Sequence, residues 1–203
     1  MSTTIYLDHG HGWKGAEQGY DPGATLGGEE VTHPDPHQTE AVLVRFLGAA
    51  LEAELRGLGI EVVTVPELGR YAARHAWVAA EAKASGAQGL YVQVHANAGG
   101  GRYALVEHDI RSVAGQRAAG IVVAEVAEAI PEITLGRRVG LKVGDRGHTC
   151  LSGIWPIPGV AGLIFELAFL DSPDHSPLWS GSGISSMARA GARGLQLALD
   201  PEP

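Results

Sequence analysis

The stretch Gly89-Leu90-Tyr91-Val92-Gln93-Val94-His95-Ala96-Asn97 is an apolar run that stops abruptly at a histidine. Its β-branched and aromatic residues are typical of a buried strand, and the glycines that follow Asn97 indicate a loop. In open α/β sheets, ligands bind just outside the carboxyl ends of the strands. His95 is therefore placed where chemistry is possible. A lone histidine at such a position is more often only a polar residue that ends a strand, so its interpretation depends on the rest of the chain.

The remaining sequence alternates between strand and helix patterns. Strands are predicted at residues 4–7, 59–65, 89–94, 103–107 and 160–166, with weaker ones at 139–143 and 150–154; helices are predicted at residues 36–58, 68–85, 112–129 and 183–199. This alternation indicates βαβ units. We expect an α/β fold: a single domain over residues 1–203 with a frayed tail from about 200, and a mostly parallel twisted sheet of about six strands with helices on both faces. Residues 13–35 lack periodicity and form a long loop, which is usually functional or mobile.

Composition limits the classes of function. The net charge is −8 over 203 residues and no basic stripe is visible, which argues against a nucleic-acid partner. No apolar run approaches the roughly 18 residues of a transmembrane helix, so we expect no membrane insertion. The single Cys150 excludes an intrachain disulfide and a zinc site built from paired cysteines. Nine histidines are a high count for this length and give a first hint of a metal site.

Polar groups follow three of the predicted strands and open one helix. His11, His95 and Glu166 stand at strand ends, and Glu40 lies in the first turns of the helix after the long loop. The carboxyl ends of parallel strands share one edge of a sheet, so these groups can converge. Two histidines and one carboxylate are a usual ligand set for catalytic zinc, with a fourth position open to water. A second carboxylate would then serve as general base for that water and as acid for a leaving amine. Glu40 and Glu166 could divide these two roles.

Several competing assignments remain open on these grounds. His9 lies two residues from His11, and strand alternation would point both side chains to the same side. Glu29 and Glu30 compete with Glu40, which could also be a first-turn carboxylate that favours the helix dipole. Glu166 could form a structural ion pair with Arg74 or another arginine. For the other candidates the simplest interpretation is a solvated loop, a turn, a surface position or core packing: His33, Asp35, His37, His75, Asn97, His108, His148, Cys150 and His175.

Taken in order, several short motifs resemble the zinc-dependent N-acetylmuramoyl-L-alanine amidases of the Amidase_3 type over nearly the whole chain. They are Leu7-Asp8-His9-Gly10-His11-Gly12, Asp21-Pro22-Gly23-Ala24, Glu40 leading a long helix into Gly59-Ile60-Glu61-Val62-Val63, Val94-His95-Ala96-Asn97-Ala98, and Ile164-Phe165-Glu166-Leu167-Ala168-Phe169-Leu170 followed by Asp174. The resemblance implies that His11, Glu40 and His95 bind Zn²⁺ and that Glu166 is catalytic. Departures from the family pattern, such as His9 in place of proline, remove no proposed ligand.

The resemblance also implies a substrate and a setting. The substrate would be peptidoglycan, cleaved at the amide between the muramic acid lactyl group and L-alanine by a lytic enzyme of the endolysin or autolysin kind. We expect a monomer. No secretory signal is visible at the N-terminus, so we expect a cytoplasmic protein released to the cell wall, or a domain of a secreted autolysin. The alternatives are a zinc peptidase, such as a carboxypeptidase acting on stem peptides, and a non-catalytic wall-binding module.

Overall fold

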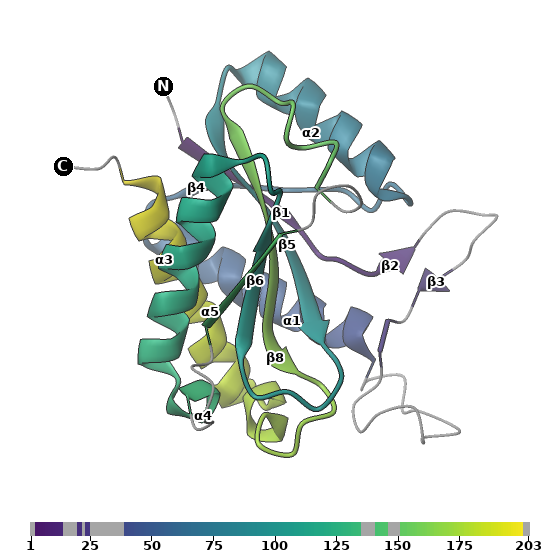
Figure 1. The fold of residues 1–203 in the computed structure, drawn as a ribbon. Helices are drawn as coiled ribbons and strands as arrows, with labels where there is room; N and C mark the ends of the chain where they lie inside the picture. The colour runs from purple at the N-terminus through teal and green to yellow at the C-terminus, as the bar shows by residue number, and fades with distance from the viewer. Residues whose placement is uncertain are drawn as a thin grey trace.

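A six-stranded sheet forms the centre of the protein (Figure 1). The computed structural model describes residues 3–13, 20–21, 23–24, 39–134, 141–145 and 151–200. The strands lie in the order β4-β1-β5-β8-β6-β7, and only the β6–β8 pair is antiparallel. The predicted mostly parallel α/β sheet is therefore confirmed. Its strands are β1 (Thr3–Asp8), β4 (Glu61–Thr64), β5 (Gln88–Asn97), β6 (Ala104–His108), β7 (Leu141–Asp145) and β8 (Val160–Phe169).

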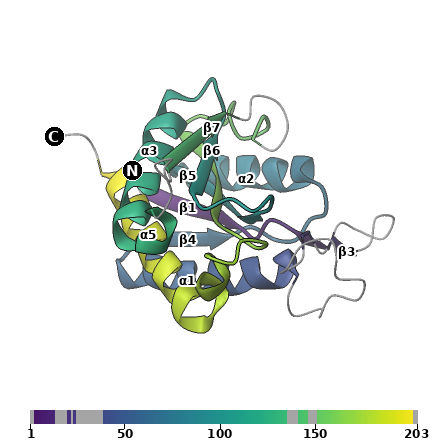
Figure 2. The same ribbon diagram turned by 60° about the horizontal axis from the view of Figure 1, so that its bottom comes forward.

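Helices cover both faces of this sheet, as predicted (Figures 1 and 2). Alternation within the strands produces the two cores: Ile5 and Leu7 of β1 face one layer, and Tyr6 between them faces the other. The larger layer consists of α1 (Glu40–Gly57), α3 (Val113–Ala129) and α5 (Gly181–Leu199), while α2 (Tyr71–Ser85) covers the opposite face. Four short elements complete the list: the antiparallel strands β2 (Gly12–Trp13) and β3 (Tyr20–Asp21), the short helix α4 (Pro131–Thr134), and the 3₁₀ turn η2 (Ser176–Trp179). Within the described ranges, none of the helices is long and apolar enough to cross a membrane.

Two predicted boundaries and one predicted strand are wrong for identifiable reasons. Helix α1 begins at Glu40 rather than at residue 36, because Thr39 is an extended N-cap and the Glu40 amide donates to the Ala24 carbonyl instead of continuing a helix upstream. Residues 151–154 form a turn rather than a strand, since the amides of Ile154 and Trp155 both donate to the Leu151 carbonyl. Strand β8 continues to Phe169, so Glu166 lies within the strand and not at its end.

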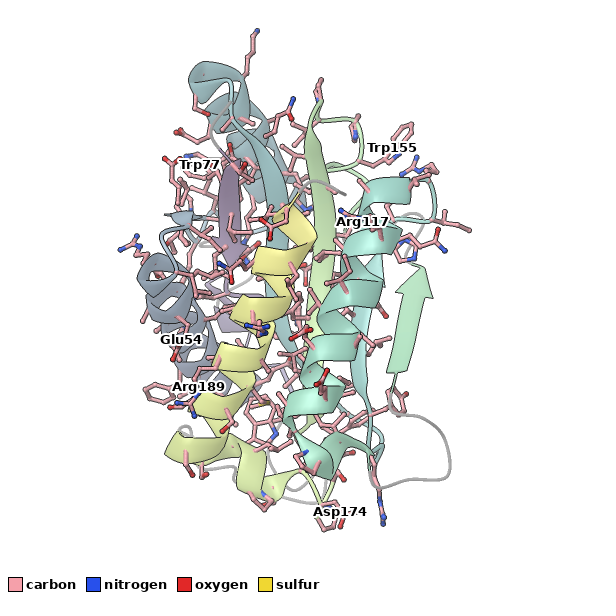
Figure 3. All side chains as sticks on the ribbon, turned by 90° about the vertical axis from the view of Figure 1, so that its left-hand side faces the viewer. Glu54, Trp77, Arg117, Trp155, Asp174 and Arg189 are labelled. Carbon is pink, nitrogen blue, oxygen red and sulfur yellow. The ribbon has the colours of Figure 1, made fainter. Side chains whose placement is uncertain are left out.

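Helix α5 lies between α1 and α3 and contacts both (Figure 3). Its contact with α3 is close at Gly194, where an added Cβ would lie 2.7 Å from the Val122 Cα. We expect Gly194→Ala to lower the free energy of unfolding by about 1–3 kcal/mol, because the helix backbones must separate to admit the methyl group. Urea unfolding followed by circular dichroism measures this change.

Gly191, one turn earlier on the same helix, is the matched control. A Cβ there would lie 3.4 Å from its nearest neighbour, the Phe165 ring, which is ordinary van der Waals contact. Gly191→Ala should therefore keep the packing and gain up to about 1 kcal/mol of helix propensity. Equal unfolding midpoints for the two variants would contradict the close α3–α5 contact at Gly194.

Candidate metal centre

His95 and Glu166 lie side by side on the two central strands of the sheet. They are register partners on the parallel strands β5 and β8, so both side chains project from the same face. This is also the face that carries Tyr91 and Ile164 and that α2 covers. Directly beyond the pair, β8 accommodates one extra residue between Glu166 and Phe169 against the span from His95 to Asn97. Such bulges are frequent next to active sites because they alter how side chains project from a sheet.

His11 reaches this region from the turn that follows β1. Gly10 allows the approach: a Cβ on it would lie 2.5 Å from the Val94 carbonyl oxygen and 2.8 Å from the His95 ring. The guanidinium of Arg74, from α2, donates to the Gly10 carbonyl at 2.6 Å and so holds the turn in place from the side of α2. As a result the rings of His11 and His95 meet edge to face, with centroids 4.8 Å apart.

Glu40 enters from the start of α1, on the side where β2 and β3 project in Figure 1. Its side chain is buried, with 4% of the residue exposed. One carboxylate oxygen, Oε1, lies 3.0 Å from His11 Nε2 and 3.0 Å from His95 Nδ1, and it also accepts the Ala96 amide at 3.0 Å. The other oxygen, Oε2, accepts the Ala24 amide at 3.0 Å. The carboxylate therefore stands between the two imidazoles.

The three candidate ligands converge on one point. One donor atom from each of His11, Glu40 and His95 lies within 4.8 Å of the other two, and no second group of three such residues occurs in the ranges that the structure describes. A tetrahedral zinc site with bonds of about 2.0–2.1 Å brings its ligand atoms to about 3.4 Å from one another. The two distances from Glu40 Oε1 to the imidazole nitrogens, 3.0 Å each, are close to that value. Two imidazoles and a carboxylate are also the donors that catalytic zinc uses, so the residues fit the ion in both type and spacing.

The charges of the cluster favour an occupant with positive charge. Burial alone would raise the pKa of Glu40, but hydrogen bonds from His11 and His95 outweigh burial and hold that pKa well below its usual range. Burial alone would lower the pKa of His11, but contact with the Glu40 and Asp21 carboxylates raises it. The site thus stabilises an ionised carboxylate and positive charge on the ring facing it, which is the electrostatic environment that a metal cation requires.

These three side chains line a common pocket of about 320 Å³ with Glu166. Tyr71 of α2, Ile164 and residues 96–98 complete its wall. Glu166 is partly exposed there, in contrast to the buried Glu40. Two larger pockets, of about 680 and 700 Å³, lie near the amino ends of β5 and β8 and include none of the four candidate residues. The small pocket is therefore the one that combines potential ligands with a second carboxylate.

The structure separates His11 from its rival His9. Both residues follow the last residue of β1, Asp8, so the strand alternation expected to point them the same way does not apply. His9 instead packs against Gly48 of α1, where a Cβ would lie 2.5 Å from its ring, and burial lowers its pKa. His9 is thus a packing residue on the far side of the turn.

Arg74, which the sequence offered as a possible ion-pair partner of Glu166, pairs with a different carboxylate. The Arg74 guanidinium binds Asp8 Oδ1 at 2.6 Å and the Gly10 carbonyl. Three further histidines, for which the sequence left both core packing and a surface position open, are buried: His75, His108 and His175. Other predictions fall outside the described residues: Glu29, Glu30, His33, Asp35, His37, His148 and Cys150.

Two residues at the site, Asp21 and Tyr71, are not predicted from the sequence. Asp21 contacts His11 Nδ1 at 2.8 Å, whereas its motif indicated only a tight turn. Tyr71 lines the pocket from the first turn of α2, and its ring stacks on His75 with centroids 6.3 Å apart. A carboxylate inside a glycine-containing turn near a candidate ligand was the available signal for Asp21. Tyr71 had none, because its place depends on how α2 docks on the sheet.

Comparison with known proteins identifies structures with the same fold, all of low sequence identity. No model of a protein family and no curated protein matches the sequence. Among solved structures, the CwlD amidase from Clostridioides difficile, in complex with the GerS lipoprotein, superposes with a TM-score of 0.73 at 18% identity, over 98% of each chain. The chain therefore has the fold of the CwlD amidase.

Two further structures share this architecture. The catalytic domain of the CD27L endolysin, which targets Clostridia Difficile, matches with a TM-score of 0.67 at 14% identity, over 96% of this chain and 97% of that one. Cwp6 from Clostridium difficile matches with a TM-score of 0.73 at 17% identity. The match covers 98% of this chain but only 30% of Cwp6, so the same fold also occurs as one part of a much longer protein.

Proposed function

We propose that this protein is a zinc-dependent N-acetylmuramoyl-L-alanine amidase that hydrolyses the amide between the muramic acid lactyl group and L-alanine of peptidoglycan. The observation that carries the proposal is the convergence of His11, Glu40 and His95 beside Glu166, in a pocket at the carboxyl edge of the sheet. The fold shared with the CwlD amidase supports the choice of reaction, and the fold shared with the CD27L endolysin supports a lytic role. We further propose that the chain acts as a monomer.

In this proposal His11, His95 and Glu40 would hold Zn²⁺ through the atoms that converge, Nε2, Nδ1 and Oε1. When bound, the ion would polarise the scissile carbonyl and lower the pKa of water in its open position. Glu166, on the strand beside His95, takes the proton from the attacking water and later gives it to the departing L-alanine amine. Its partial exposure suits this role, since a general base must meet both water and substrate.

Identification of the bond that is cleaved tests the proposal. Purified peptidoglycan would be digested with the zinc-loaded protein, and the products would be examined by mass spectrometry. An amidase releases stem peptides with a free L-alanine amino group and leaves glycan strands with free muramic lactyl carboxylates. The reaction should stop after treatment with a chelator and resume when zinc is restored.

The same digest distinguishes the competing functions. A zinc peptidase acting on the stem peptide would shorten the peptide and leave the lactyl amide intact. A non-catalytic wall-binding module would sediment with peptidoglycan and release nothing, with or without zinc. Either outcome would overturn the amidase proposal.

A further inference from the structure

Asp21 connects the chain before α1 to the metal cluster. Its Oδ2 lies 2.8 Å from Nδ1 of His11, the ring nitrogen that does not face Glu40. The carboxylate is partly shielded, with 22% of its side chain exposed, and the His11 side chain is 17% exposed. An ionised carboxylate only accepts hydrogen bonds, so the Nδ1–H of His11 is the donor in this contact.

The same turn also holds Glu40. The second oxygen of Asp21, Oδ1, accepts the Gly23 amide at 3.2 Å, and Gly23 adopts a left-handed conformation with φ of +67°. The turn then presents Ala24, whose amide donates to Glu40 Oε2 at 3.0 Å while its carbonyl accepts the Glu40 amide at 2.8 Å. The approach is so close that a Cβ on Gly23 would lie 2.6 Å from Glu40 Oε2.

From these contacts we infer that Asp21 is a positioning residue that orients two ligands of the metal centre, His11 directly and Glu40 through Gly23 and Ala24. The inference rests on the metal site of the proposed function. When the His11 ring is neutral and keeps its proton on Nδ1, its lone pair lies on Nε2, the nitrogen that faces Glu40 Oε1. The bond from the Ala24 amide to Oε2 orients the Glu40 carboxylate so that its other oxygen, Oε1, faces both imidazoles.

The geometry exceeds what a turn alone requires. A turn-forming aspartate needs only the bond from one oxygen to the amide two residues ahead, which the Oδ1 contact with Gly23 supplies. The second oxygen is directed at the ring of a residue ten positions earlier in the chain. A carboxylate on the outer nitrogen of a ligating histidine fixes its tautomer and ring orientation, and loss of such a partner typically weakens metal binding by about 10–100-fold.

The test is a zinc titration of the metal-free protein in competition with a chromophoric chelator. Asp21→Asn keeps the shape of the side chain but can donate to Nδ1 and so favour the opposite tautomer; we expect its zinc affinity to fall by about 10–100-fold. Asp171→Asn is the matched control. Asp171 likewise accepts glycine amides, those of Gly99 and Gly100, but contacts no proposed ligand, so zinc affinity should stay within about twofold. Zinc affinity of Asp21→Asn within the same range would overturn the inference.

Two further measurements keep the test independent of folding and of catalysis. Long-range ¹H–¹⁵N correlation spectra of the zinc-loaded wild-type protein should show His11 protonated on Nδ1; protonation on Nε2 would overturn the inference without any variant. Gly23→Ala should weaken zinc binding while Asp21 is intact, because its Cβ displaces Glu40. None of these readouts involves turnover. If the tautomer is as expected and zinc binding is weakened, but the protein releases no stem peptides, the amidase proposal would be contradicted and the role of Asp21 would stand.

Discussion

Replacement of Glu166 by glutamine should lower the rate of peptidoglycan hydrolysis by about 10²–10⁴-fold, the usual contribution of a general base. Glutamine fills the same volume on β8 beside His95, but it cannot take a proton from water or return one to the leaving amine. Zinc binding should be unchanged, because Glu166 is not one of the three residues whose donor atoms converge. Turbidity loss of a cell-wall suspension measures the rate, and metal analysis of the same sample measures the zinc content.

A parallel variant, His95→Ala, separates a catalytic effect from a metal-binding one. This substitution removes a donor atom from the cluster, so zinc content and rate should fall together. Glu166→Gln should lose rate alone. Full lytic activity in Glu166→Gln would rule out Glu166 as the general base, and loss of its zinc would instead place Glu166 among the ligands.

The sequence identifies four side chains that the structure brings to one pocket, but it does not predict how they are arranged there. The apolar run before His95 and the run before Glu166 are correctly predicted as buried strands, because short runs rich in β-branched and aromatic residues favour strands. That the two residues are register partners depends on which strands become neighbours and on the register between them, and the bulge beyond the pair is equally non-local. Neither is a local property, so no periodicity could predict it.

The errors at the start of α1 and at residues 151–154 have the same origin. Helix α1 begins where the Glu40 amide meets the Ala24 carbonyl, a partner sixteen positions earlier, so a local pattern extends the helix too far. The apolar residues at 151–154 resemble a strand, but they serve the core beneath α2 from within a turn: Leu151 and Ile154 are both fully buried. Their side chains are apolar because they are buried, and burial alone does not distinguish a strand from a turn.

Replacement of Arg74 by methionine should lower the free energy of unfolding by about 3–5 kcal/mol, because it removes one partner of a buried ion pair. Arg74 and Asp8 are each 2% exposed, and Asp8 also accepts the Tyr91 hydroxyl at 2.5 Å. Without the guanidinium, the Asp8 carboxylate would be left buried with no cation. Chemical unfolding in urea at neutral pH measures the loss.

The double variant Asp8→Asn with Arg74→Met should recover much of that loss, because a neutral amide in place of the carboxylate no longer requires a cation. The pH dependence provides a second check. Burial raises the pKa of Asp8 even beside Arg74, so protonation of this group favours the folded state. The stability that it contributes is fully present below the ordinary aspartate pKa and is lost as the pH rises through the raised one. The deficit of Arg74→Met should therefore shrink in acid; a deficit that is the same at every pH would point to lost packing rather than to the unpaired charge.

The consequence extends to the metal cluster through Gly10. Arg74 holds the Gly10 carbonyl with the same nitrogen that binds Asp8, and Gly10 is the residue that lets His11 approach His95. In the double variant, where the charge imbalance is removed, zinc affinity should still be below that of the wild-type protein. The hydrogen bond from Arg74 to the Gly10 carbonyl is lost there, and methionine cannot replace it. A double variant that regains both stability and zinc affinity would show that Arg74 serves only to neutralise Asp8. Recovery of stability without recovery of affinity would show that Arg74 also positions the turn before His11.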